Sequence, residues 1–306
     1  MTLLKHIALL LFAFNFAACS NSNDHPQDQP AQGNAQLTPD NSEGGVYTPD
    51  VESLPEPKVP KDELRAQLAK INQEYEAAKK IAEPLERLTH LQYLTSRTIL
   101  VAAQAYDREG DYLKQIKDYR KRFTVTPGSE ALASNLQKTM LGLYSAYALM
   151  YSIRFDEREE RMKILESLRD NIEQKMKPEI PLIDAMAEMA VGSYKLLSDI
   201  MKDIDAEGRY KQSFEQSEQL FKQGTEVATS EEDHYLNGVF RMYEITKLWA
   251  NLLNADATKE LAGMQAKMIQ RQDEADDIGQ QMSRAMEDLF LLSRKMTEYT
   301  IDITYK

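Results

Sequence analysis

The sequence is poor in residue types that cross-link a chain or break helices. Among its 306 residues there is one cysteine, Cys19, so the chain can form no internal disulfide. There are twelve glycines and eleven prolines, and seven of the prolines lie in the first sixty residues. The rest of the chain is almost free of helix breakers, so we expect it to be mostly helical.

Several motifs of enzymes and of nucleic-acid-binding proteins are missing as well. The chain has no glycine-rich phosphate loop and no nucleophile elbow, and beyond residue 60 it holds only two histidines, His90 and His234. The formal net charge of -12 argues against binding to a phosphate backbone, which requires clustered Lys and Arg. We therefore expect no nucleic-acid partner, no cofactor and no catalytic residues.

One short spacing matches half of a metal site. Glu231 and His234 are three residues apart, as in helical bundles that hold two metals through carboxylates, but a second such pair is missing. Ser230 followed by acids instead reads as the N-cap and first turn of a helix. Met186 and Met189, the closest methionine pair, suit a hydrophobic core better than copper binding. We predict no metal site.

Residues 1–18 have the features of a secretory signal. Lys5 precedes an apolar run over residues 7–16, and small residues follow. The run is too short to span a bilayer as a permanent helix. Bulky Phe16, three residues before Cys19, disfavours an ordinary signal-peptidase cut in front of that cysteine.

Ala17, Ala18 and Cys19 resemble the lipobox of bacterial lipoproteins. The resemblance implies cleavage after Ala18, with acyl chains such as palmitate on Cys19. Two or three chains would hold the protein firmly on a membrane. In Gram-negative lipoproteins a residue other than Asp after the cysteine, here Ser20, implies sorting to the outer membrane. The alternative is a soluble secreted protein with a free thiol or with cleavage after Ser20.

Residues 19–60 have the composition of a tether. They are rich in Pro, Asn, Gln and Ser and contain seven acids against one lysine, with almost nothing apolar to bury. A flexible chain of this length spans roughly 35 Å. We expect a folded domain over 61–306, facing either the periplasm or the cell exterior.

From residue 61 onward, apolar residues recur at helical spacing. Pro84 either opens a new helix or kinks a continuous one. We expect residues 129–176 to form one very long helix or two helices joined near Phe155. The pattern predicts further helices over 61–82, 84–110, 111–123, 181–206, 209–225 and 231–253.

Segment 261–299 has the most regular pattern of the chain. Apolar residues recur every seven positions, with a second set between them that is interrupted at Arg271. This predicts a coiled-coil-like seam roughly 60 Å long, which could pair two copies of the chain or be covered by its own helices. The seam consists of Leu261, Met264, Met268, Ala275, Ile278, Met282, Ala285, Leu289, Leu292, Met296 and Tyr299.

One unit, residues 102–127, resembles a tetratricopeptide helical hairpin. A second echo follows 98 residues later around Gly208, Tyr210 and Ser213, a distance that is no multiple of the family's 34-residue period. The resemblance implies an α-solenoid as an alternative architecture. The matching residues of the first unit are Tyr106, Gly110, Asp111, Tyr112, Tyr119 and Pro127.

A basic helix face is the first candidate binding surface. It gives helix 111–123 a local positive balance within an acidic domain. Such a face could meet an acidic partner, lipid head groups or lipopolysaccharide, or be ordinary surface. It comprises Lys114, Lys117, Arg120, Lys121 and Arg122.

The C-terminal tail is the second candidate. Residues Tyr299, Ile301, Ile303 and Tyr305 alternate with polar residues, which is the pattern of a half-buried strand. Such a strand could pair with residues 123–126, extend the sheet of a partner, or fray.

Together these patterns predict an all-α protein, a bundle of long antiparallel helices and helical hairpins. We expect an outer-membrane lipoprotein whose domain binds a protein partner, with a homo-oligomer through the seam as an added option. The alternative is a carrier of a small ligand or metal in the bundle core. An enzyme is the third reading.

Overall fold

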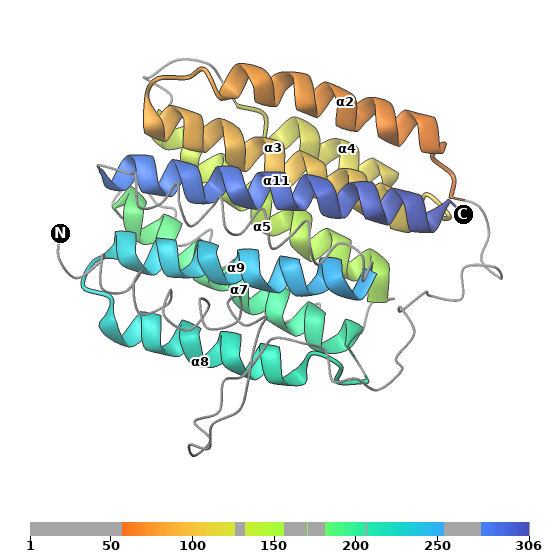
Figure 1. Cartoon of the computed structure of the whole chain (residues 1–306). Helices are drawn as coiled ribbons and strands as arrows, with labels where there is room; N and C mark the ends of the chain where they lie inside the picture. The colour runs from red at the N-terminus through yellow and green to blue at the C-terminus, as the bar shows by residue number, and fades with distance from the viewer. Residues whose placement is uncertain are drawn as a thin grey trace, which may run out of the picture.

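A computed structural model describes residues 57–125, 132–155, 170, 181–205, 207–253 and 277–305. The described part is all-α, as predicted: its regular elements are helices joined by loops, and it contains no strand. Figure 1 shows the long helices lying roughly side by side. They are α2 (Lys61–Ala78), α3 (Pro84–Tyr106), α4 (Leu113–Arg122), α5 (Leu132–Phe155), α7 (Leu182–Ile204), α8 (Lys211–Val227), α9 (Glu231–Leu253) and α11 (Ile278–Thr304).

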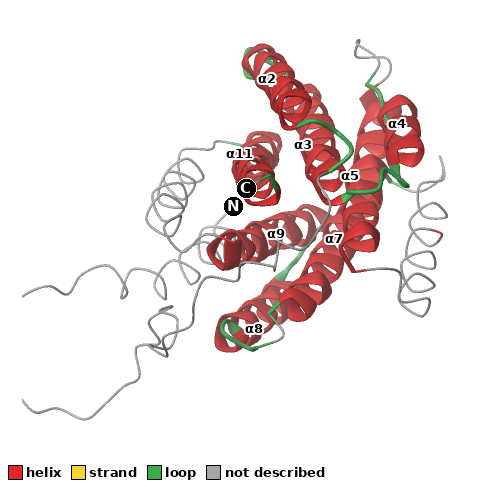
Figure 2. Cartoon of the chain, turned by 90° about the vertical axis from the view of Figure 1, so that its right-hand side faces the viewer, coloured by secondary structure: helices red, strands yellow, loops and turns green. Residues whose placement is uncertain are grey.

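Five of these helices form a closed ring. In chain order α3, α5, α7, α9 and α11 each pack against the next, and α11 returns to pack against α3 (Figure 2). Contacts between α3 and α11 advance together along both helices, from Arg87 with Ser283 to Thr98 with Thr297. The two helices that close the ring therefore run parallel.

The remaining described helices, α2, α4 and α8, lie outside the ring, and α2 and α8 run antiparallel to the ring helices that they contact. On α2, Glu74 pairs with Arg97 of α3, while Gln67, which is earlier in α2, reaches Gln104 further along α3. Contacts of α8 with α9 reverse in the same way. Each of α2, α4 and α8 thus precedes a ring helix as the outer half of a helical hairpin.

The ring helices recur at a nearly constant interval along the chain. They begin at residues 84, 132, 182, 231 and 278, which is every 47 to 50 residues. This interval explains why the two sequence echoes lie 98 residues apart, since that distance spans two hairpins. The 34-residue spacing of tetratricopeptide repeats does not appear among the described helices, and the solenoid alternative is not confirmed.

Local capping sets the starts of three ring helices. Pro84 opens α3 as a new helix, and the Glu83 side chain accepts a hydrogen bond from the Glu86 backbone N–H. Ser230 caps α9 as predicted, because its hydroxyl accepts from the Asp233 N–H at 3.2 Å while Asp233 accepts in return from Ser230.

The start of α11 corrects the predicted seam. Asp277 has extended backbone, with φ -136° and ψ 164°, and its side chain accepts from the Gln280 N–H at 2.8 Å. A continuous helix over 261–299 is therefore wrong, because an N-cap interrupts it at 277. Residues 261–276 of the seam lie outside the described residues. Its second half, including Met282, Leu289 and Met296, is buried within this chain.

The predicted C-terminal strand is also wrong. Helix α11 continues to Thr304, and Ile301 is buried while Tyr299, Ile303 and Tyr305 are partly buried. Packing on the ring outweighs the strand-like alternation, because helical spacing buries Thr300, Ile301 and Thr304 together. The described part of the proposed partner segment, residues 123–125, contains no strand, and Phe123 is the C-cap of α4. Residue 126 lies outside the described residues.

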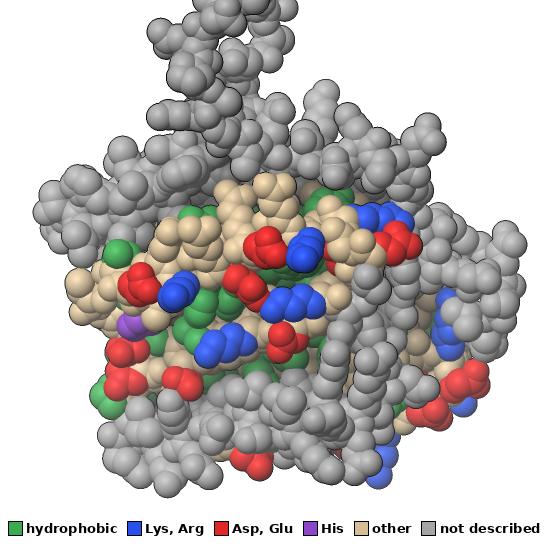
Figure 3. All heavy atoms as spheres, turned by 90° about the horizontal axis from the view of Figure 1, so that it is seen from below, with side chains coloured by type: hydrophobic (Ala, Val, Ile, Leu, Met, Phe, Trp, Pro, Cys, Tyr) green, Lys and Arg blue, Asp and Glu red, His purple; other side chains and the backbone are tan. Residues whose placement is uncertain are grey.

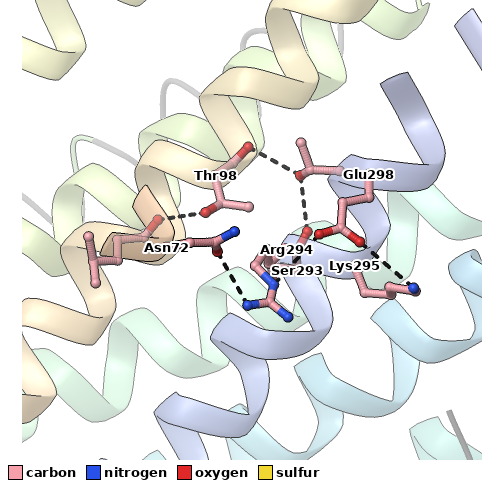
Figure 4. A network of polar contacts seen from close by, with 8 residues as sticks. Asn72, Thr98, Ser293, Arg294, Lys295 and Glu298 are labelled. Atoms are coloured by element: carbon pink, nitrogen blue, oxygen red, sulfur yellow. Dashed lines mark hydrogen bonds and ion pairs between the residues drawn. The ribbon is translucent and has the colours of Figure 1, made fainter. Parts of the chain in front are cut away.

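Polar contacts join α2, α3 and α11 where the ring closes (Figure 4). Arg294 of α11 donates to the Asn72 side chain of α2 at 3.2 Å, and Thr297 donates to the Thr98 carbonyl of α3 at 3.2 Å. Glu298 forms ion pairs with Arg294 and with Lys295, both within its own helix. These contacts fix the register of α11 between its two neighbours.

Residues 57–60 pack against the helices, although composition placed them at the end of the tether. The Lys58 backbone N–H donates to the Arg108 carbonyl at 2.9 Å. Val59 is buried, and its carbonyl accepts from the Tyr305 hydroxyl. The chain therefore joins the domain between the loop after α3 and the end of α11.

Candidate functional site

A layer of polar and sulfur-containing side chains crosses the interior of the ring. Gln92 of α3 accepts from Thr139 of α5 at 2.8 Å and lies within 3.4 Å of the Tyr235 hydroxyl of α9. Met140 and Met286 complete the layer as sulfur acceptors. Burial raises the pKa of Tyr235 well above its ordinary value. This layer is packed and internally bonded, so we regard it as structural.

A second buried polar layer lies closer to the C-terminal ends of α5, α9 and α11, and fewer of its hydroxyls have hydrogen-bond partners. Burial raises the pKa of Tyr147 to about 12, and the hydroxyls of Ser293 and Thr246 oppose that shift. None of these contacts gives Tyr147 a hydrogen bond of normal geometry, and the hydroxyls of Tyr243 and Ser293 also find no partner among the described residues. Buried hydroxyls of this kind usually meet ordered water or a ligand.

Charged side chains cluster between α7, α8 and α9. Buried Arg241 donates to Glu244 at 2.6 Å, and Ser217 donates to the same carboxylate at 3.3 Å. Burial lowers the pKa of Lys247, with Arg241 adding to that effect and Glu244 opposing it. The cluster joins the ring helix α9 to its outer helix α8, so we regard its role as structural.

The two domain histidines do not meet. His90 lies in α3 near Glu86 and Glu74, and burial lowers its pKa. His234 lies in the first turn of α9, beside the capping residue Asp233. Among the described residues no group of three or more His, Cys, Asp and Glu side chains could hold a metal ion. Met186 and Met189 are buried in the core.

Two helix corners have the same geometry. After α3, the Asp107 carboxylate accepts from the Tyr112 N–H at 3.1 Å, and Gly110 has φ +78°. After α7, Asp205 accepts from the Tyr210 N–H at 2.7 Å, and Gly208 has φ +71°. The left-handed φ requires glycine at both places. These are the two tetratricopeptide-like echoes, and the structure shows that each turns the chain onto an outer helix.

The first corner leads into the basic helix α4. Ile116 and Phe123 attach α4 to the domain and are almost fully buried. Gly142 of α5 allows this approach, because a Cβ there would lie 2.9 Å from Phe123. Four of the five predicted basic residues are exposed, namely Lys114, Lys117, Lys121 and Arg122.

Arg120 does not belong to the exposed basic face. It turns toward α2, where it donates to the Gln67 side chain at 2.5 Å. Burial and the nearby charge of Arg97 lower its pKa to about 10. The helical spacing could have indicated this, because Arg120 is four residues from Ile116 and lies on the buried side of the helix.

Several other residues were not predicted from sequence. Tyr147, Thr246 and Ser293 come from three helices, and no local pattern connects them. Lys58 gave no signal either, yet its Nζ donates to the Glu109 carbonyl at 3.3 Å and its stem lies against Gly110. The proposed lipidation site Cys19 lies outside the described residues. Within the described helices, no stretch is both long and apolar enough to cross a membrane.

No family model, curated protein or solved structure matches this chain.

Proposed function

We propose that this protein is a lipid-anchored envelope protein whose helical domain acts by binding a protein partner. The anchor would be Cys19, after cleavage behind Ala18. The lipobox-like sequence and the Ser20 that follows support an outer-membrane location. The domain would then work at the end of a tether, facing the periplasm or the cell exterior.

The packing inside the ring carries the preference for surface binding. Large side chains from several ring helices fill the interior, and Tyr144, Tyr235 and Phe290 are at most 1% exposed. A ring filled in this way leaves binding to its outer surface. In the described part of that surface, Val227 is the single large apolar side chain that is exposed, so contacts would be mainly polar.

Cross-linking in intact cells followed by affinity capture tests the binding role. We expect a defined envelope protein to be captured with the anchored protein and to be lost, or much reduced, with Cys19→Ser. Ser20→Ala is the matched control and should preserve capture, because alanine, like serine, keeps a residue other than Asp after Cys19. Failure to capture any protein, together with one bound small molecule or metal per chain, would contradict the proposal.

The anchor itself has a separate test. Cys19→Ser should abolish labelling by a palmitate analogue and release the protein from membranes, because the thioether has no other site on the chain. Membrane fractionation and labelling of the two variants give both readouts. Persistent attachment of the Cys19→Ser protein would show that the anchor proposal is wrong.

One observation favours the second candidate, an internal ligand carrier. The unsatisfied hydroxyls of Tyr147, Tyr243 and Ser293 come from three ring helices, α5, α9 and α11. They could hold water or a small polar ligand. Native mass spectrometry distinguishes these cases, because a retained ligand adds a fixed mass that denaturation removes.

A further inference from the structure

The geometry points to α4 as a docking surface for anionic phospholipid headgroups of the membrane that holds the anchor. This inference rests on the proposed lipid anchor and adds an orientation to it.

The cations of α4 lie opposite its buried side. Lys114, Lys117 and Lys121 follow each other at steps of three and four residues, which places them on one face of a helix. Ile116 and Phe123 project from the other side into the core. The lysines are therefore the outermost part of this helix, which itself lies at the edge of the described helices (Figure 2).

These three lysines are free to contact a surface. None of them forms an ion pair among the described residues, and the only acid on the helix is Asp118. Exposed Arg122 extends the basic strip beside them. The strip stands out on a chain with net charge -12, most of whose surface an anionic membrane would repel.

The entry point of the chain selects a membrane rather than another acidic partner. Lys58 contacts the carbonyls of Arg108 and Glu109 and packs on Gly110, in the corner that leads into α4. Residues 20–56 would connect that corner to Cys19. A flexible chain of this length reaches roughly 30–35 Å, so α4 begins at the part of the domain held closest to the anchor.

Tethering makes a weak contact sufficient. Near an anionic leaflet each Lys or Arg strengthens binding about five-fold. A short flexible tether supplies an effective concentration of about millimolar, so a few cations can hold the domain down without a high-affinity site. Salt should weaken the contact, because screening shortens the reach of surface charge.

Vesicle co-sedimentation tests the docking surface apart from the anchor. The probe is the chain over residues 19–306 carrying Cys19→Ser, with vesicles of phosphatidylcholine alone or mixed with phosphatidylglycerol. Total lipid is raised to about 10 mM, so that a contact that is weak without the tether is still detected. We expect binding to the mixed vesicles only, and its loss at high salt. Replacing Lys114, Lys117 and Lys121 by Gln should weaken binding roughly a hundred-fold.

A matched variant controls for net charge. Lys195, Lys211 and Lys222 are exposed on α7 and α8, and changing them to Gln removes the same charge from another part of the surface. This control should bind within about five-fold of the parent. Circular dichroism would show that both variants remain folded.

The other outcomes overturn the docking proposal. Equal loss in both variants would mean that only net charge matters. Unchanged vesicle binding by the α4 variant, with loss of a cross-linked protein partner in cells, would make α4 a protein-binding surface. Absence of vesicle binding refutes the docking while leaving the anchor intact, since membrane release by Cys19→Ser in cells is a separate measurement.

Discussion

The corner between α3 and α4 and the corner between α7 and α8 have the same backbone conformation, but the helices that follow them differ in charge. Each has an aspartate, a glycine with positive φ and a tyrosine at the same offsets, 98 residues apart. Helix α4 carries five cations against one acid, whereas α8 mixes both signs.

This difference in charge shows that the corner residues are needed for the fold, whereas the solvent-facing residues of α4 and α8 can vary. Corner residues are constrained because φ above zero and the aspartate cap admit few side chains. Outer positions of α4 and α8 face solvent, where charge can change at little cost in stability. Figure 3 shows the face that includes α8, where acidic and basic side chains are interspersed. Function therefore has room to differ between units of one geometry.

Glycines inside the two hairpins should give the largest effects. A Cβ on Gly238 of α9 would lie 2.8 Å from the backbone of Ala190, whereas one on Gly142 would meet the Phe123 side chain at 2.9 Å. We expect Gly238→Ala to cost about 3 kcal/mol of unfolding free energy, and Gly142→Ala to cost less because a side chain can shift. Urea denaturation measures both. Equal costs would show that the contact between α4 and α5 is as rigid as the contact between α7 and α9.

The corner glycines come next. Gly110→Ala and Gly208→Ala should each cost about 1–2 kcal/mol, because a Cβ disfavours the left-handed conformation. Gly110→Ala should cost more, since its Cβ would lie 2.6 Å from the Lys58 stem while Gly208 has nothing closer than 3.8 Å. The double variant Gly110→Ala with Lys58→Ala should reduce that excess. No reduction would remove Lys58 from the explanation.

Alkaline pH should destabilise the packing of α7 more than that of α3. Burial raises the pKa of Tyr194 in α7 to about 12, while the matching position of α3 holds Ser96. Stability is full below pH 10 and falls as pH rises toward the folded pKa, because the unfolded tyrosine ionises first. Tyr194→Phe should lessen this fall and change stability at pH 7 by less than about 1 kcal/mol. Denaturation at several pH values tests this, and an unchanged alkaline fall would contradict it.

Transfer of positive charge to α8 should have the smallest effect on stability. Glu215, Glu218 and Glu226 are exposed on α8, and replacing them by Lys gives α8 a basic face. Loss of their few surface ion pairs should cost under about 1 kcal/mol. In the chain with neutralised α4, this transfer of charge should restore binding to phosphatidylglycerol vesicles. The tether does not enter the domain next to α8, so restored binding would show that a local cluster of positive charge is enough for vesicle binding. Failure would show that vesicle binding also depends on the shape of α4.

Much of the helical layout was predictable because it depends on local rules. Pro84, Ser230 and the apolar spacing of α7 and α9 set helix starts and buried faces from residues close in sequence. The errors came where distant packing prevailed. Alternation over residues 299–305 suggested a strand, and the ring turned it into helix. Four of the five predicted basic residues are exposed. The fifth, Arg120, instead donates a hydrogen bond to Gln67 on a helix more than fifty residues earlier.

By itself, the sequence determined that this protein is helical, where most helices begin and end, and which residues carry a local excess of positive charge. These properties follow from capping, helix breakers and spacing within a few turns. Only the tertiary structure decided that five helices close into a ring, that these ring helices begin every 47 to 50 residues and that Lys58 meets the corner before α4. Such contacts join residues far apart in the chain, so they depend on how whole helices pack and no local pattern encodes them.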